Sequence, residues 1–198
     1  MAADPGVDVR ALGLDLDVSD AASVLRLPDA VRRMAGSLDL LINNAAAFVD
    51  WGEVGSDADL ELARSVMETN LFGAWRVTQA LLPLLRESAH ARVVNVSSGA
   101  GSHGDEAFGL ARRGGRAASY GVSKAALGAL TATLAAELDG AGILINAVCP
   151  GLTATWPGAV QMWARPVADG AASVPVAAAL PEGGPYGGFF RDGRPLAW

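Results

Sequence analysis

The 198-residue sequence has a single cysteine and only two histidines, and both scarcities narrow its function. Cys149 has no second thiol to pair with, so no internal disulfide is possible, and a reducing compartment, the cytoplasm, is expected. His90 and His103 have no cysteine or histidine partners at ligand spacing, which argues against a zinc site.

Long apolar runs and strongly basic runs are also missing. No stretch of about 18 apolar residues is present, and the first ten residues do not read as a signal peptide, so we expect no membrane association. The net charge is −6, and the most basic stretch, 112–116, is short and typical of a solvated loop. We therefore expect no nucleic-acid partner.

The residues that are present describe a globular protein. Hydrophobic residues make up 51% of the chain and charged residues 18%, which is unlike a disordered sequence. A length of 198 residues suits one domain with a sizeable core, so we expect a single domain over 1–198.

Short apolar runs alternate with longer helical patterns along the chain. We predict strands at 9–14, 38–42, 92–96 and 143–148, and helices at 21–36, 57–86 and 119–139. Ser19 or Asp20 could cap the first helix, Pro28 is expected to break or restart it, and Gly140 to end the third. The alternation predicts a doubly wound, three-layer α/β fold with a parallel sheet covered on both faces.

Small and polar residues follow each predicted strand. They are Leu16-Asp17-Val18, Asn43-Asn44-Ala45, Ser97-Ser98-Gly99 and Cys149-Pro150-Gly151. Because open α/β sheets bind ligands beyond the carboxyl ends of their strands, these segments predict a site at that edge.

Residues 119–126, SYGVSKAA, place Tyr120 and Lys124 four apart on one predicted helix face. An ammonium beside a phenol favours the phenolate and lowers its pKa, which prepares a tyrosine for proton transfer. The spacing alone is common, so its meaning depends on the neighbouring motifs.

Six motifs in order resemble those of the short-chain dehydrogenase/reductase family. They are LDVSD (16–20), NNA (43–45), the asparagine of METNLFG (67–73), VVNVSS (93–98), YxxxK (120–124) and PGLTAT (150–155). Within that family the chain is most similar to the carbonyl reductases, from VVNVSS to the tail GGPYGGFFRDGRPLAW.

The resemblance implies a Rossmann-like fold and NADPH-dependent reduction of a small carbonyl compound to an alcohol, with NAD as the other cofactor. By this resemblance Tyr120 is the general acid, Lys124 lowers the pKa of that tyrosine and holds the nicotinamide ribose, and Ser98 binds the substrate oxygen. Asn70 would anchor a water that links Lys124 to solvent. The remaining cofactor contacts that the resemblance implies are Asp17 and Val18 at the adenine, Asn43 at the adenosine ribose, and Thr153 and Thr155 near the nicotinamide carboxamide.

Simpler interpretations compete for other residues. Ser97 is expected to be structural, and Cys149 to be a small buried hydrophobe, with a modifiable thiol as the alternative. Core packing is expected for the remaining aromatic residues, with a pocket or lid role as the alternative: Trp163, Phe189, Phe190 and Trp198.

Residues 99–104, GAGSHG, match GxGxxG, but the following segment is interrupted by glycines and does not continue as a helix. A pyrophosphate site needs the N-terminus of a helix, so we interpret this stretch as a substrate-side loop.

The family's glycine-rich TGxxxGxG turn is absent, as if one strand–helix–strand unit preceded residue 9. In the strand order 3-2-1-4-5-6, that absence would leave the strand at 38–42 with a bare edge, and we expect an upstream reading frame to encode the unit. Ala46 also replaces a family glycine. Two functions remain open: a carbonyl reductase, as a monomer or homo-oligomer, or a fold relative without cofactor that serves as a binding protein.

Overall fold

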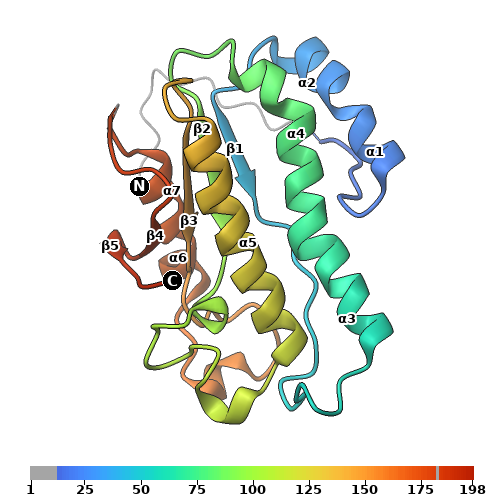
Figure 1. The fold of residues 1–198 in the computed structure, drawn as a ribbon, viewed down its shortest axis with the longest axis vertical. Coiled ribbons are helices and arrows are strands. Elements are labelled where there is room, and N and C mark those ends of the chain that lie inside the picture. Colours follow the sequence, from blue (N-terminus) through green and yellow to red (C-terminus); the bar gives the residue numbers. More distant parts are fainter. Residues whose placement is uncertain (1–12, 182) are drawn as a thin grey trace.

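A computed structural model describes residues 13–181 and 183–198 (Figure 1). Within these residues a five-stranded sheet has the order β1-β2-β3-β4-β5, formed by Leu40–Asn43, Arg92–Val96, Leu144–Val148, Phe189–Arg191 and Arg194–Pro195. The first four strands run parallel and β5 returns antiparallel to β4. The predicted Rossmann-like α/β fold is confirmed.

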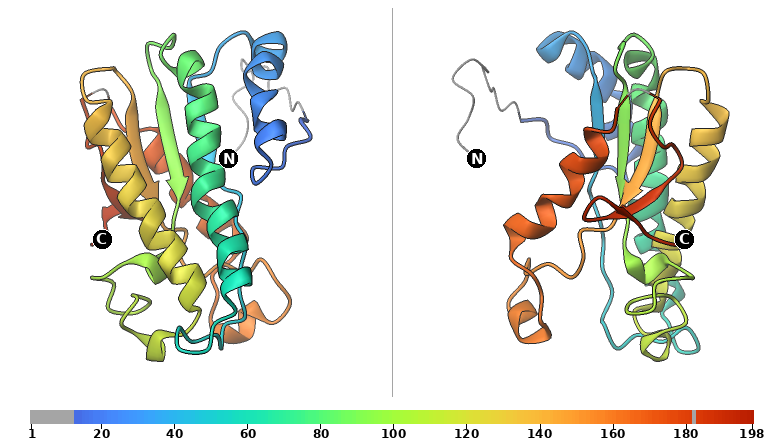
Figure 2. Two further views of the ribbon diagram at one scale, coloured as in Figure 1. Left: turned by 45° about the vertical axis from the view of Figure 1, so that its right-hand side comes forward. Right: turned by 90° about the vertical axis from the view of Figure 1, so that its left-hand side faces the viewer.

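Helices lie on both faces of the sheet, which gives three layers (Figure 2). The helices are α1 (Ala21–Leu25), α2 (Leu27–Ala35), α3 (Leu60–Met67), α4 (Ala74–Leu85), α5 (Ala118–Glu137), α6 (Val167–Ala171) and α7 (Ser173–Ala178). α4 and α5 cover one face, with α1 and α2 packed against α4, while α7 lies on the opposite face.

The pleat of the strands divides the core into two parts. Leu41, Val93 and Ile145 share one register line and point towards α4 and α5, where the larger core lies. Val94 and Val148 point to the other face and pack against Ala177 of α7. On β1 this second face is open, since Ile42 is 41% exposed.

The first helical segment divides at its proline, as the sequence predicts. Asp20 accepts a hydrogen bond from the backbone N–H of Ala22 and caps α1. Pro28 lies in the first turn of α2, where its missing N–H has no intrahelical partner to lose.

The predicted helix over 57–86 forms one continuous rod of α3, a π turn at Glu68–Gly73, and α4. A π turn inserts one extra residue into the helical repeat. Gly73 is required here because a Cβ atom at this position would lie 2.8 Å from the side chain of Val18. The rod therefore rests directly on the segment that leads into α1.

The first predicted strand falls largely outside the described residues. Positions 9–12 are not described, and Gly13 and Leu14 belong to no strand. Over the described part of the chain β1 pairs only with β2, so its other edge has no strand partner there.

A short β-hairpin that was not predicted, β4 and β5, completes the sheet beyond β3, and the C-terminal tail packs against it. The rings of Phe189 and Trp198 stack with centroids 4.9 Å apart. Gly128 of α5 leaves room for this stack, since a Cβ atom there would lie 2.5 Å from the Trp198 ring. Trp163 differs from the core packing we expected: it is 94% exposed, on a turn after the 3-10 segment Ala159–Met162.

Candidate active site

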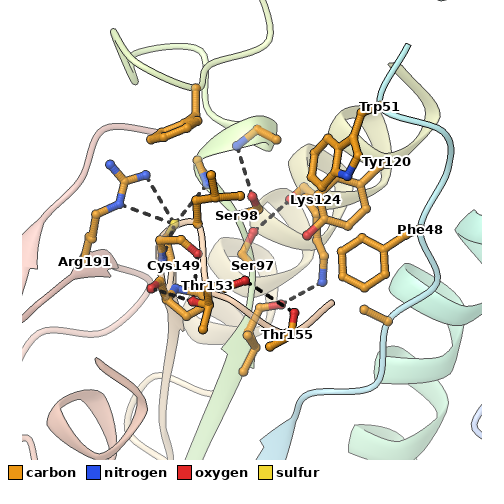
Figure 3. Close-up of a pocket in the computed structure, with 18 of the residues that line it drawn as sticks. Phe48, Trp51, Ser97, Ser98, Tyr120, Lys124, Cys149, Thr153, Thr155 and Arg191 are labelled. Atoms are coloured by element: carbon orange, nitrogen blue, oxygen red, sulfur yellow. Dashed lines mark hydrogen bonds between the residues drawn. The ribbon is translucent and has the colours of Figure 1, made fainter. Parts of the chain in front are cut away.

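A cavity of about 620 Å³ opens at the carboxyl ends of the central strands (Figure 3). Its walls come from segments that directly follow β1, β2 and β3, together with the first turns of α5. This is the edge of the sheet at which the small polar segments predicted a site. Of the sequence-predicted residues, Ser98, Tyr120, Lys124, Thr153 and Thr155 all line the cavity.

Tyr120 lies in the first turn of α5 and is buried in an aromatic cluster. The ring of Phe48 stacks on it with centroids 4.9 Å apart, and Trp51 meets it edge-on at 6.2 Å. Burial raises the pKa of Tyr120 to about 12, although the nearby Ser98 hydroxyl acts in the opposite direction. The lowered pKa that we expected from Lys124 is therefore not found, because loss of solvent outweighs the neighbouring groups.

Lys124 lies one turn further along α5 and is buried. Its Nζ donates a hydrogen bond to the Val96 carbonyl at 2.8 Å and lies 5.7 Å from the centroid of the Tyr120 ring. Burial lowers the pKa of Lys124 from its ordinary 10.5 to about 8, with the Cys149 sulfur acting in the opposite direction. The ammonium form therefore still predominates at neutral pH, with its midpoint only a little above.

The two serines after β2 have different roles. Ser98 Oγ accepts a hydrogen bond from Ala100 N at 3.2 Å, caps the 3-10 turn Gly99–Gly101, and faces the cavity. Ser97 Oγ donates to the Lys124 carbonyl at 3.2 Å and thereby ties β2 to α5, the structural role we expected.

The GAGSHG glycines are explained by close packing. A Cβ atom on Gly101 would lie 2.5 Å from the backbone of Lys124 and Ala125, so the turn needs glycine to approach α5. Gly99–Gly101 are buried and form a 3-10 turn that no helix follows directly. The N-terminal helix turn that a pyrophosphate needs is not formed here.

Asn70 lies in the π turn and is buried. Its Oδ1 accepts from Ala47 N at 2.7 Å, while its Nδ2 donates to the Ala47 carbonyl and to Ser123 Oγ. Asn70 thus fastens the loop after β1 to α5. Both amide hydrogens are engaged, so a bound water would meet its oxygen atoms.

Three predicted cofactor residues do not line the cavity. Asn43 points into the helix-side core, where its Nδ2 donates to Thr78 Oγ1 and Asn95 Oδ1. The Asp17 carboxylate accepts from Ser19 N and Oγ, and Val18 packs against Gly73. In this structure their printed contacts are with the sheet and its first connection, and their role at the cofactor stays a prediction.

A buried polar cluster on the cavity wall joins Cys149, which belongs to a predicted segment, to Arg191 and Asp105, which no motif indicated. Cys149 Sγ accepts hydrogen bonds from Gly99 N, Gly151 N and the Arg191 guanidinium at 3.2–3.4 Å. Arg191 also pairs with the buried Asp105 at 2.5 Å. Figure 3 shows Cys149 and Arg191 across the cavity from Phe48 and Trp51. Only the fold brings these distant positions together.

Two findings concern the described residues alone. No group of three or more His, Cys, Asp or Glu side chains is placed to hold a metal ion in that part of the chain. Among the same residues, none of the helices has both the length and the apolar character that a membrane span requires.

A parallel sheet with helices on both faces, and a buried Tyr–Lys pair at the carboxyl ends of its strands, defines a Rossmann-like α/β protein. The family model for short chain dehydrogenases matches residues 3–159. The chain therefore belongs to the short-chain dehydrogenase/reductase family.

Individual relatives agree with this assignment. A 3-oxoacyl-[acyl-carrier-protein] reductase of rhamnolipid biosynthesis from Pseudomonas aeruginosa is 37% identical over 139 residues, covering 68% of this chain and 50% of that protein. Short-chain dehydrogenase/reductase 1 of Saponaria officinalis is 32% identical over 227 residues, covering 88% and 74%. The chain thus spans about half the length of the first relative.

Solved structures give the same result. The crystal structure of an NADPH-bound carbonyl reductase from chicken fatty liver superposes with a TM-score of 0.78 at 30% identity, over 92% of this chain and 75% of that one. This likeness supports the resemblance to the carbonyl reductases that the motifs indicated.

Proposed function

We propose that this protein reduces a ketone or aldehyde to an alcohol with a reduced nicotinamide cofactor. The observation that carries the proposal is that Tyr120 lines an apolar cavity together with Ser98, with the Lys124 ammonium 5.7 Å from the centroid of its ring. NADPH is the first candidate, because the chicken carbonyl reductase was solved with it, and NADH is the second.

The described residues fit the nicotinamide end of such a cofactor. Lys124 has three N–H donors and makes one hydrogen bond, to the Val96 carbonyl, so it could also hold ribose hydroxyls. Thr153 and Thr155 line the same cavity and offer hydroxyls for the carboxamide. Asn44, which we did not predict as a cofactor residue, lines it as well.

Tyr120 would supply the proton of the reaction. The cofactor supplies the hydride that reaches the carbonyl carbon. Tyr120 O–H donates its proton to the carbonyl oxygen as negative charge develops there, and Ser98 holds that oxygen in place. With a pKa of about 12, Tyr120 is fully protonated at neutral pH and ready to act as the acid.

Lys124 would return the proton to Tyr120. A pKa of about 8 lets its ammonium release a proton near neutral pH, and the ammonium lies beside the Tyr120 ring. We also propose that Asn70 anchors a water that links Lys124 to solvent. The water would bind an oxygen atom of Asn70, because both amide hydrogens are already donated to Ala47 and Ser123.

The second candidate function is a binding protein that does not use the cofactor. It is favoured by one observation: Gly99 and Gly101 of GAGSHG, the segment that formally matches GxGxxG, are buried against neighbouring residues and open no α-helix. Titration with NADPH and with NADH separates the two candidates. Tight binding supports the reductase, whereas a folded protein that binds neither supports the binding protein.

Replacement of Tyr120 tests the proposed mechanism. We expect Tyr120→Phe to lower kcat for ketone reduction by at least about 100-fold, because general acid catalysis contributes about 10²–10⁴-fold. NADPH affinity should change little. Tyr186→Phe is the matched control, because Tyr186 is the other tyrosine, is 52% exposed, and does not line the cavity. Near-normal turnover in Tyr120→Phe would remove Tyr120 from the mechanism.

A further inference from the structure

The charged side chains that line the cavity all have the same sign. They are Arg113, Lys124 and Arg191, and no aspartate or glutamate is among the described lining residues. The chain as a whole has 21 acidic and 15 basic residues and a net charge of −6. A cleft lined by one sign of charge concentrates the opposite sign, so this cavity favours anions on a protein that is acidic overall.

Two of these cations are already engaged inside the protein. Lys124 donates to the Val96 carbonyl and lies against Tyr120. Arg191 is neutralised by Asp105, and its Nε and Nη2 donate to Cys149 Sγ. An anionic ligand that paired with Lys124 or Arg191 would have to compete with these internal contacts.

Arg113 is different because no carboxylate of the described residues pairs with it. Its Nη2 donates to the Phe108 carbonyl at 3.0 Å, and its guanidinium carbon lies 5.9 Å from the centroid of the Phe108 ring. The guanidinium of Arg191 lies 5.6 Å from the same ring. The loop therefore holds the Arg113 charge at the cavity wall without neutralising it.

The rest of the substrate side of the cavity is apolar and aromatic. Trp51 and Trp156 line it, with ring centroids 5.7 Å apart, and Met162 is a further lining residue. A ligand that fits these surfaces has an apolar body, and a guanidinium fork binds a carboxylate through two parallel hydrogen bonds.

We propose that Arg113 is a specificity-determining residue, which directs this cavity towards carbonyl compounds that carry a carboxylate beside an apolar body. The inference rests on the proposed function, because it names the substrate class of the same cavity. It is separable from that function, since the binding of a carboxylate by Arg113 requires no turnover.

Binding of 4-acetylbenzoate and of its neutral amide, 4-acetylbenzamide, tests the proposal by calorimetry without cofactor. The two ketones have similar shapes and differ in charge. We expect the protein to bind the acid more tightly, and Arg113→Gln to raise the Kd of the acid about tenfold, as for loss of a charged hydrogen-bonding partner. The Kd of the amide should change less than about twofold, and Arg113→Lys should restore part of the affinity.

Arg112→Gln is the matched control, because it removes the same charge from the same exposed loop at a residue that does not line the cavity. The proposal is overturned if Arg112→Gln raises the Kd of the acid as much as Arg113→Gln does. It is also overturned if the acid binds no more tightly than the amide, or if neither compound binds.

NADPH-dependent reduction of the same two compounds distinguishes this failure from failure of the proposed function. Reduction of the amide with no advantage for the acid contradicts the role of Arg113 and leaves the reductase in place. An Arg113-dependent preference for binding the acid, with reduction of neither compound, supports the role of Arg113 and contradicts the reductase.

Discussion

Lys124 is a charged side chain that the fold encloses next to its proposed proton acceptor. Its pKa falls from 10.5 to about 8 because burial penalises the ammonium. Below about pH 8 the lysine is protonated in both the folded and the unfolded state, so the folded state bears the full penalty of a buried charge. Between pH 8 and 10.5 only the unfolded chain retains the proton. The free energy of unfolding should therefore rise with pH across this window.

Lys124→Met should remove this pH dependence, because methionine fills similar space without a titrating group. We expect the stability of the wild-type protein, relative to Lys124→Met, to increase by about 2 kcal/mol between pH 7 and pH 10. Urea unfolding at a series of pH values measures it. The range ends at pH 10 because of Tyr120, whose pKa is about 12 in the folded protein and 10 in the unfolded chain. Above pH 10 the tyrosine of the unfolded chain ionises first, and this lowers the free energy of unfolding. A difference independent of pH would contradict a buried, titrating Lys124.

The sequence identified the residues whose spacing has a chemical meaning. Local motifs predicted Tyr120, Lys124 and Ser98, and all three line the cavity, while their catalytic roles stay predictions. Arg191 and Asp105 could not be found in this way, because their ion pair joins positions 86 residues apart. The family resemblance implied a cofactor role for Asn43, and no sequence pattern showed that its side chain points to the core face of the pleat.

At the scale of elements, α5 begins without a capping side chain of its own. Its N-cap is Ala117, in a left-handed conformation, and alanine has no oxygen with which to satisfy the first N–H groups. Glu53, from the loop after β1, supplies the cap instead. Its Oε2 accepts from Ser119 N and its Oε1 from Ser119 Oγ, both at 2.8 Å.

Glu53→Ala should destabilise the protein by about 1 kcal/mol, the typical effect of losing a helix cap. It should also loosen the contact of Phe48 and Trp51 with Tyr120, because the same loop carries these rings. Urea unfolding measures the stability, and near-ultraviolet circular dichroism the aromatic contacts. Asp57→Ala, an exposed carboxylate of that loop, is the control and should change neither. Equal effects of the two substitutions would show that Glu53 does not cap α5.

Prediction of elements succeeded where periodicity and breakers agree. The strand at 92–96 was predicted with its observed bounds, and Pro28 marks the start of α2. The hairpin of β4 and β5 was missed because strands of three and two residues are too short to show alternation. The π turn was missed because hydrophobic periodicity does not reveal one inserted residue.

For the whole molecule, the two faces of β1 are covered to different extents. Leu41 is buried against the helix-side core, whereas Leu40 and Ile42 on the opposite face are 38% and 41% exposed. The pleat places these neighbours on opposite faces of one strand. Substitutions at Leu41 and at Leu40 therefore measure the packing on the two faces of the sheet separately.

Leu41→Ala should lower the free energy of unfolding by about 2–5 kcal/mol, as expected for a cavity in a packed core. Leu40→Ala should cost less than about 1 kcal/mol, because its side chain is already partly in solvent. Urea unfolding of both variants, with unchanged m-values, measures the contrast. A Leu40→Ala penalty equal to that of Leu41→Ala would mean that another part of the protein covers this face.

The π turn at Glu68–Gly73 gives the rod a place at which its length can vary. The extra residue is accommodated within the turn, so the helical segments on either side keep their phase. Deleting one residue there would restore ordinary α geometry and leave Leu81 and Leu85 facing the core. Deleting one residue within α4 itself would instead rotate everything after it by about 100° about the helix axis. Evolution can therefore add or remove one residue at the π turn more easily than elsewhere in the rod.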